Sequence, residues 1–305
     1  MNRSPFAHEI TPTPTKVECV AETRSIAGES PVWSVAEKCL YFVDHQGHKI
    51  HRYRPAEGGL DTFDLPGVVT SLAPRRSGGL IVTIERRFAF FYPDSGRLED
   101  RFSVEPELPD NRFNDGKCDR QGRFWAGTMG KIAWDSPCGS LYRLAGEGAP
   151  ERMRAEIRCS NGLAWSPDDR TFYYAESFAY MIHAFDFDAK SGTIGNRRVF
   201  AALDPRSGAF PDGLTVDVEG CVWNAQPVFG RIVRYDPQGK LDRIVETPVS
   251  RCTSCIFGDD DLGTMYVTSA RETLTAAEIE EEPLAGGLFA FRPGVHGIAE
   301  VPFAG

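Results

Sequence analysis

The sequence lacks several features that mark common classes of protein. No apolar run approaches the ~20 residues that a membrane-spanning helix needs, and residues 1–15 contain proline and threonine but no apolar core of a secretion signal. Basic residues are the minority, with 34 Lys and Arg against 43 Asp and Glu and a formal net charge of −9. A nucleic-acid-binding surface normally needs a clustered basic patch. We therefore expect a soluble, cytoplasmic protein that binds neither membranes nor nucleic acid, with no obligate protein partner evident.

The chain also lacks the motifs of two large hydrolase classes. It contains neither the GxSxG elbow of serine hydrolases nor the HExxH helix of zinc proteases. Among its 8 cysteines, Cys252 and Cys255 form a CxxC pair without a second pair at the spacing of a zinc site. For a chain of 305 residues with no secretion signal, we expect buried thiols rather than disulfides.

One pattern, by contrast, is abundant: an apolar or aromatic tetrad that occurs six times. The tetrads begin at Leu40, Leu80, Phe124, Phe172, Val222 and Met265, at intervals of 40, 44, 48, 50 and 43 residues. Aromatic and β-branched residues favour buried strands. Turn sequences rich in Asp and Gly precede four of the tetrads, at residues 119–122, 167–169, 217–220 and 259–263.

This period predicts the architecture. A repeat of about 40–50 residues with four short strands is typical of a β-propeller blade. Helical repeats of similar length need amphipathic stretches, and only residues 274–282 look helical. We predict an all-β chain that folds as a six-bladed β-propeller, a single domain at residues 16–305 after a disordered tail at residues 1–15.

Polar residues stand about ten positions before each tetrad, where the innermost strand of a blade should begin beside the central channel. They are Glu29, Thr70, Ser71, Asn114, Asp115, Asn161, Asp212 and Ser254. Carboxylates and amides buried around one axis are costly unless a cation or protons neutralise them. Such oxygen ligands suit Ca²⁺, Mg²⁺ or Mn²⁺, with Zn²⁺ also possible. We therefore expect one divalent ion on the axis.

A simpler interpretation exists for the same residues. The Asn-Gly and Asp-Gly steps at residues 114–116, 161–162 and 212–213 are also common turn sequences. They could be turns between blades. However, these residues and Glu29 all stand at about the same distance before a tetrad, in four of the blades. This common position favours the metal centre.

Three histidines at zinc-like spacing do not strengthen the metal hypothesis. His45, His48 and His51 flank Gly47, which we place in a hairpin turn, and side chains on a strand alternate between faces. The three imidazoles should therefore diverge. His45 alone remains a candidate for contact with a substrate.

Several motifs together carry a family resemblance. They are GESPVW (28–33), NRFNDGK (111–117), GRFWAGTM (122–129), SNGLAWS (160–166), PDGL (211–214), CTSCIFG (252–258), MYVTSAR (265–271) and AGGLF (285–289). From about Ile26 to the C-terminus, the chain resembles the regucalcin (senescence marker protein 30) and gluconolactonase family of sugar lactonases.

The resemblance implies a six-bladed propeller that binds one divalent ion through Glu29, Asn161 and Asp212 and hydrolyses sugar lactones. The family's substrate-contacting Arg and Asn fall on Arg112 and Asn114. The sequence departs from the family after the GTM motif, where Gly130 and Lys131 stand in place of an acidic residue of the substrate pocket. This departure leaves the substrate preference open.

Lactone chemistry suggests roles for the remaining polar residues. The carbonyl must accept negative charge while water loses a proton, and a cation assists both changes. Asp212 is our candidate base, although it could instead be only a metal ligand. Asp115 either orients Arg112, Asn114 or a water on the ion, or only caps the turn before Gly116. Lys131 and His45 are possible supporting residues.

Specificity is expected in the loops that follow the second strand of each blade. These loops contain His45, Glu85, Arg86, Lys131, Trp134, Glu176, Phe178, Gln226, Phe229 and residues 271–286. The longer ones, around residues 131–138 and 273–283, are candidate lids over a polyol.

The predicted function is metal-dependent hydrolysis of an aldono-1,4- or 1,5-lactone to the aldonic acid, as in a gluconolactonase. Two alternatives stay open: a non-catalytic, regulatory calcium-binding propeller, and a hydrolase of other esters or phosphotriesters at the same metal. The Arg112 and Asn114 pair favours hydrolysis of a polyhydroxylated ester, because a scaffold that only binds an ion has no evident need of it.

Overall fold

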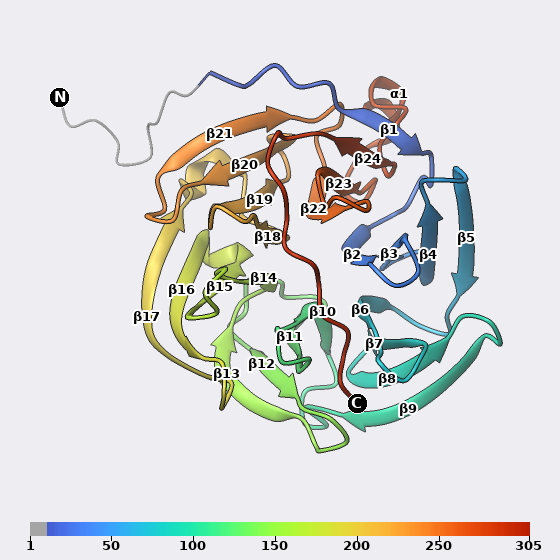
Figure 1. The fold of residues 1–305 in the computed structure, drawn as a ribbon, viewed down its shortest axis with the longest axis vertical. Helices are drawn as coiled ribbons and strands as arrows, with labels where there is room; N and C mark the ends of the chain where they lie inside the picture. The colour runs from blue at the N-terminus through green and yellow to red at the C-terminus, as the bar shows by residue number, and fades with distance from the viewer. Residues whose placement is uncertain (1–10) are drawn as a thin grey trace.

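The computed structural model describes residues 11–305, which form six four-stranded antiparallel sheets arranged in a ring (Figure 1). Five sheets follow chain order: β2 (Gly28–Ser34), β3 (Cys39–Asp44), β4 (Lys49–Arg54) and β5 (Gly59–Asp64); β6 (Val69–Pro74), β7 (Leu80–Ile84), β8 (Arg87–Tyr92) and β9 (Arg97–Ser103); β10 (Asn111–Cys118), β11 (Phe124–Gly130), β12 (Gly139–Leu144) and β13 (Glu151–Ile157); β14 (Ser160–Trp165), β15 (Thr171–Glu176), β16 (Met181–Asp188) and β17 (Thr193–Ala202); β18 (Leu214–Val216), β19 (Val222–Gln226), β20 (Arg231–Tyr235) and β21 (Leu241–Glu246). The sixth contains β22 (Cys252–Gly258), β23 (Thr264–Ser269), β24 (Leu288–Phe291) and β1 (Glu18–Ala21). The predicted six-bladed propeller is confirmed.

Each of the six tetrads lies in the second strand of its blade, as the period predicts. These strands are buried along their whole length or nearly so, because each blade packs on the blades at both sides. Between the first two blades, for example, Tyr41 and Val32 pack in one cluster with Leu72 and Val82. The helices are short: η1 (Ser177–Ala179), η2 (Pro205–Ser207) and α1 (Ala276–Glu281), the last within the predicted helical segment.

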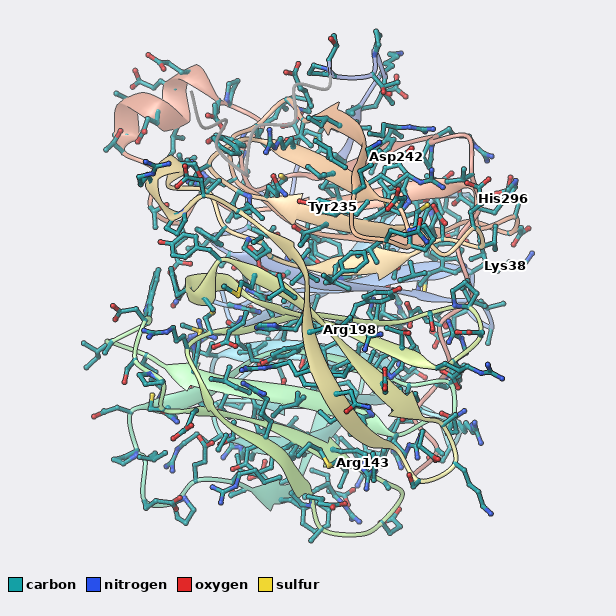
Figure 2. All side chains as sticks on the ribbon, turned by 90° about the vertical axis from the view of Figure 1, so that its left-hand side faces the viewer. Lys38, Arg143, Arg198, Tyr235, Asp242 and His296 are labelled. Atoms are coloured by element: carbon teal, nitrogen blue, oxygen red, sulfur yellow. The ribbon has the colours of Figure 1, made fainter. Side chains whose placement is uncertain are left out.

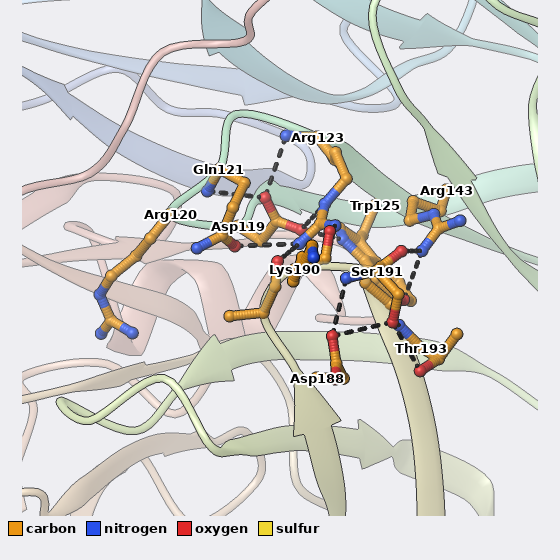
Figure 3. Close-up of polar contacts among 12 residues, drawn as sticks. Asp119, Arg120, Gln121, Arg123, Trp125, Arg143, Asp188, Lys190, Ser191 and Thr193 are labelled. Carbon is orange, nitrogen blue, oxygen red and sulfur yellow. Dashed lines mark hydrogen bonds and ion pairs between the residues drawn. The ribbon is translucent and has the colours of Figure 1, made fainter.

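The Asp-rich turns before the second strands follow a repeated design. Asp119 Oδ1 accepts from the backbone N–H groups of Gln121 and Arg123, both at 3.0 Å, and Asp119 Oδ2 accepts from Trp125 Nε1 at 2.9 Å (Figure 3). Asp217 makes the same contacts two blades later, with Trp223 Nε1 at 2.9 Å. One carboxylate thus closes the turn and fixes the large aromatic ring of the next strand.

The ring is closed by a strand that sequence reasoning did not place. Strand β1 pairs with β24, bringing Glu18 opposite Ala290, so the last blade draws strands from both ends of the described chain (Figure 1). Of the predicted tail, residues 1–10 lie outside the described residues. Residues 11–15 have no regular secondary structure, and the Thr13 N–H donates to the Ile244 carbonyl at 2.9 Å.

The two faces of the ring differ. In the side view of Figure 2, the helix α1 lies at one face, and the labelled Lys38 and His296 lie at the other. The C-terminal segment after β24 crosses this second face (Figure 1), where Gly297 bridges to Asp217 and Phe303 to Arg75. Within this segment, the side chain of Phe303 is fully buried. The opposite face, with the loop to α1, is left for the site.

Candidate functional site

A cavity of about 130 Å³ lies where the inner strands begin. Its floor comes from the first residues of those strands, including Glu29, Asn114 and Thr253. Its walls come from loops that follow second strands, including those with His45 and Phe178. Of the eight candidate metal ligands, substrate contacts and supporting residues, six line this cavity: Glu29, His45, Arg112, Asn114, Asn161 and Asp212.

Irregularities in the inner strands aim these side chains at the axis. The register shifts between Glu29 and Val32 in β2, and immediately after Asn161 in β14. A bulge of this kind redirects a side chain without ending the strand. Asn114 lies within a similar shift in β10. These polar residues are therefore parts of bulged inner strands, and the alternative of turns between blades is wrong for residues 114–116 and 161–162.

Glycines let the inner strands approach one another beside these residues. A Cβ on Gly213 would lie 2.0 Å from Ser254 Oγ, and a Cβ on Gly162 would lie 2.6 Å from the Asp212 carbonyl oxygen. Gly162 also has a positive φ of 24°. The Asn-Gly and Asp-Gly steps are thus required by close approach at the axis rather than by a reversal of the chain.

Glu29, Asn161 and Asp212 come together from the first, fourth and fifth blades, and all three are buried. Asn161 Nδ2 donates to Ser177 Oγ at 3.0 Å, and Asn161 Oδ1 is buried with no hydrogen-bond partner among residues 11–305. Asp212 Oδ1 is likewise buried and has no partner within this range. Buried polar atoms without partners are rare in folded proteins. An amide oxygen and a carboxylate oxygen without partners, beside the carboxylate of Glu29, suit a hard divalent cation, so the residues present fit the predicted metal.

The electrostatics lead to the same conclusion. Burial raises the pKa of Glu29 well above its usual range, and the charges of Asp212 and Asp115 raise it further. The pKa of Asp212 is raised in the same way by burial and by Asp115. Without a cation, the cluster would therefore hold its protons to a higher pH than isolated carboxyl groups do.

Arg112 stands beside this cluster and is held by Asn114. Its Nη1 donates to Asn114 Oδ1 and to the Phe113 carbonyl, both at 2.8 Å. Asn114 Nδ2 in turn donates to the Ser160 carbonyl at 2.8 Å. Asn114 therefore orients the guanidinium and keeps spare hydrogen-bonding capacity on its amide. Among residues 11–305, all side-chain hydrogen bonds of Arg112 come from Nη1, so Nε and Nη2 remain for a ligand.

His45 lies in the cavity wall as a neutral ring. Its Nε2 is 2.8 Å from the Thr70 carbonyl, and burial together with the charge of Arg112 lowers its pKa to about 3. A neutral imidazole bonded to a carbonyl is suited to position a neighbour, not to exchange protons near pH 7.

Asp115 and Lys131 do not line the cavity. Asp115 Oδ1 accepts from Ser30 Oγ at 2.6 Å and from the Gly116 N–H at 2.8 Å. Asp115 therefore lies outside the cavity lining, and its charge raises the pKa of Glu29 and of Asp212. Lys131 pairs with Glu85 at 2.8 Å. The family resemblance places an acidic pocket residue at this position. In this chain the position holds Lys131, and neither Lys131 nor its partner Glu85 lines the cavity.

An aromatic wall completes one side. Trp134 and Phe178, both in the predicted specificity loops, have ring centroids 6.3 Å apart, and Phe178 lies 5.5 Å from Phe210. Sequence reasoning missed Phe210 and also Arg251, which lines the cavity from the last blade. Phe210 falls two residues before Asp212, so the phase of the repeat could have identified it.

A second acidic group lies outside the cavity. Asp217, Glu219 and Cys221 bring their ligand atoms within 4.8 Å of one another. Asp217 already closes its turn, and Arg234 Nη2 pairs with Asp217 at 2.8 Å and with Glu219 at 2.5 Å. This arginine neutralises the group, so we assign it to the turn and not to a metal.

The predicted thiols are confirmed: all eight cysteines are free, although Cys19 and Cys138 are only half-buried. Within the described residues, no helix has the length and apolar character needed to cross a membrane.

Residues 27–271 match the family model described as the SMP-30/Gluconolactonase/LRE-like region. The chain belongs to this family. Regucalcin from Gallus gallus is 39% identical over 296 residues, covering 95% of this chain and 99% of that protein. The 6-deoxy-6-sulfogluconolactonase of Pseudomonas putida is 37% identical with the same coverage.

A solved structure of another protein has the same fold. Regucalcin from Agrobacterium tumefaciens, described as a calcium-binding protein, has a TM-score of 0.91 and 28% identity over 96% of this chain and 99% of that one. All six predicted residues that line the cavity fall inside the family region, from Glu29 to Asp212.

Proposed function

We propose that this protein hydrolyses a sugar lactone, an aldono-1,4- or 1,5-lactone, to the aldonic acid with the aid of one divalent ion held by Glu29, Asn161 and Asp212. Residues 16–305 would act as one catalytic domain. The identity of the ion, Ca²⁺, Zn²⁺, Mn²⁺ or Mg²⁺, is left to experiment. Eight free thiols agree with a cytoplasmic location.

One observation carries the proposal: unpaired oxygens of Asn161 and Asp212 meet Glu29 at the floor of a cavity that also presents Arg112. A site for an ion alone needs only the first three residues. The guanidinium, with two nitrogens free among the described residues, adds a donor for the oxygens of an ester and its hydroxyls. The name of the Pseudomonas putida relative, a 6-deoxy-6-sulfogluconolactonase, agrees with a lactone as substrate.

The residues would divide the reaction between them. An ion in this site would polarise the lactone carbonyl and favour the loss of a proton from water. Water adds to the carbonyl carbon, the bond from that carbon to the ring oxygen breaks, and the ring oxygen leaves with a proton as a hydroxyl. Arg112 would bind the substrate's oxygens and Asn114 would hold Arg112 in place. The aromatic wall of Trp134, Phe178 and Phe210 would exclude bulk water from one side.

Asp212 is the residue we propose to accept the proton of the attacking water. Its Oδ1 has no hydrogen-bond partner in the part of the chain that the structure describes, so the carboxylate has capacity beyond a single ligand bond. Ligation by a cation lowers the basicity of a carboxylate, and in that case Asp212 would act as a ligand alone.

A non-catalytic role in calcium binding is the second candidate, favoured by the description of the Agrobacterium tumefaciens relative. A single assay separates the two. Protein stripped with a chelator is tested on a panel of aldonolactones by proton release, with each of the four ions restored separately. We expect acceleration over spontaneous ring opening only with ion present. Ion binding without acceleration of any lactone would support the binding role and refute our proposal.

A further inference from the structure

A carboxylate that the sequence motifs did not identify stands in the cavity wall. Glu272 lies in the loop between β23 and α1 and lines the cavity together with Arg112. The family match ends at residue 271, just before it. Glu272 belongs to the sixth blade and Arg112 to the third, and in a ring of six these blades lie across the axis from each other (Figure 1).

The backbone and side chain of Glu272 are both held. The N–H groups of Arg271 and Glu272 donate to the Ile26 carbonyl at 2.9 and 2.8 Å, which ties this loop to the first blade. Gln46 Nε2 donates to Glu272 Oε1 at 3.2 Å. The carboxylate is therefore preorganised, and within residues 11–305 this is the hydrogen bond that its side chain makes.

Glu272 and Arg112 attract each other across the cavity without touching. Burial raises the pKa of Glu272, while the positive charge of Arg112 lowers it. Among the described residues, these two side chains form neither a hydrogen bond nor an ion pair with each other. A hydroxyl group between them could accept from the guanidinium and donate to the carboxylate, satisfying both charged groups at once.

The rest of the cavity agrees with a ligand that has one polar edge. Trp134 and Phe178, with ring planes 32° apart, offer an apolar face on the side of the third and fourth blades. Arg251 is turned toward Ser250 beside it and toward Thr273 in the loop of Glu272, with Nε donating to Thr273 Oγ1 and Nη1 to Ser250 Oγ, both at 3.2 Å. Glu272 is thus the charged acceptor that faces Arg112 from the opposite wall.

We propose that Glu272 is a specificity-determining residue that accepts a hydrogen bond from a hydroxyl of the polyol lactone, opposite Arg112. The inference rests on the proposed lactone hydrolysis. It also accounts for Lys131: the acidic residue expected after the GTM motif is replaced by a carboxylate from the facing blade, and Lys131 pairs with Glu85 instead.

The test compares two lactones that share a six-membered ring. D-glucono-1,5-lactone carries hydroxyls, and δ-valerolactone carries none. For Glu272→Ala, we expect kcat/KM to fall about ten- to hundredfold on the hydroxylated lactone, the range for a hydrogen bond to a charged group, and to change by less than about threefold on δ-valerolactone. Glu272→Gln, which keeps a carbonyl acceptor, should lie between Glu272→Ala and wild type.

The matched control is Glu280→Gln, an equal change of charge at an exposed position of α1 in the same loop. It should leave both rates unchanged. Calorimetric titration provides a readout besides turnover: Glu272→Ala should keep the Ca²⁺ affinity of wild type but bind gluconate at least about tenfold more weakly.

The outcomes separate the two proposals. No hydrolysis of any lactone by wild type overturns both. Hydrolysis by wild type with equal losses on the two lactones in Glu272→Ala, or with no loss, overturns only the role of Glu272. So does unchanged binding of gluconate, or a fall in Ca²⁺ affinity that accompanies the loss of activity.

Discussion

The buried acidic cluster predicts an unusual response to removal of one of its own members. Glu29, Asp115 and Asp212 have raised pKa values because they are buried together. A raised folded-state pKa means that the native state holds protons that the unfolded chain, with carboxyl pKa values near 4, has released. The stabilisation from each group is therefore present below about pH 4 and is lost as pH rises through the folded pKa.

The magnitudes follow from this linkage. For each proton held only by the folded state, the free energy of unfolding falls by about 1.4 kcal/mol per pH unit. At ~2–4 °C per kcal/mol, the Tm of the ion-free protein should fall by about 3–6 °C per pH unit for each such proton. An ion at 100 times its Kd raises the free energy of unfolding by about 2.7 kcal/mol, which raises the Tm by roughly 5–10 °C.

Asp212→Asn should consequently have opposite effects in the two states. In a chelator at pH 8, the Tm of this variant should be higher than that of wild type, because one buried negative charge is removed. With excess Ca²⁺, it should melt below wild type, because a ligand is gone. Tryptophan fluorescence on heating measures both, with Asp135→Asn at an exposed position as control. A variant that melts below wild type in the chelator at every pH would refute the assignment of a repulsive, ion-neutralised cluster.

Three further substitutions test other parts of the site. Arg112→Ala should retain ion binding by calorimetry and lose turnover by about a hundredfold or more, since the free guanidinium donors face the substrate; wild-type turnover would contradict this. Lys131→Ala should change kcat/KM by less than about threefold, because the half-exposed pair with Glu85 contributes about 1 kcal/mol or less and lies outside the cavity; a larger loss would place Lys131 at the substrate. Asp217→Asn should lower the free energy of unfolding, measured by denaturant titration, by about 2–4 kcal/mol, because Arg234 loses its buried partner. The Ca²⁺ affinity should not change, and a loss of Ca²⁺ affinity would show that Asp217 belongs to a metal site.

Much of the fold could be predicted from the sequence because its strongest signal is local. The tetrads at Leu40 and Phe124 are buried on both faces, so their apolar runs stand out without knowledge of any partner strand. Their period then fixes where the inner strands begin, and with them Glu29 and Asn161. A short strand such as β1 carries no such signal, because it is half-exposed and its partner β24 lies some 270 residues away in the chain.

The detail of the site was harder to predict because it depends on contacts between blades. The bulge after Asn161 is a matter of register and leaves no mark in composition. The partner of Lys131 is Glu85 in the preceding blade, and a single sequence does not reveal that pairing. Glu272 lies in a loop whose position is set by the carbonyl of Ile26, at the other end of the chain.

The same dependence links ion binding to closure of the ring. Glu29 lies in the first blade and Asp212 in the fifth, and the blade between them is the one that β1 completes by pairing with β24. The first and last blades also contact each other directly, because Trp33 packs in one cluster with Tyr266 and the Ile26 carbonyl accepts from the loop after β23. An ion that bridges Glu29 and Asp212 would act across this junction, as the pairing of β1 does. Because both interactions favour the closed ring, each should strengthen the other by reducing the conformational freedom that the other must overcome.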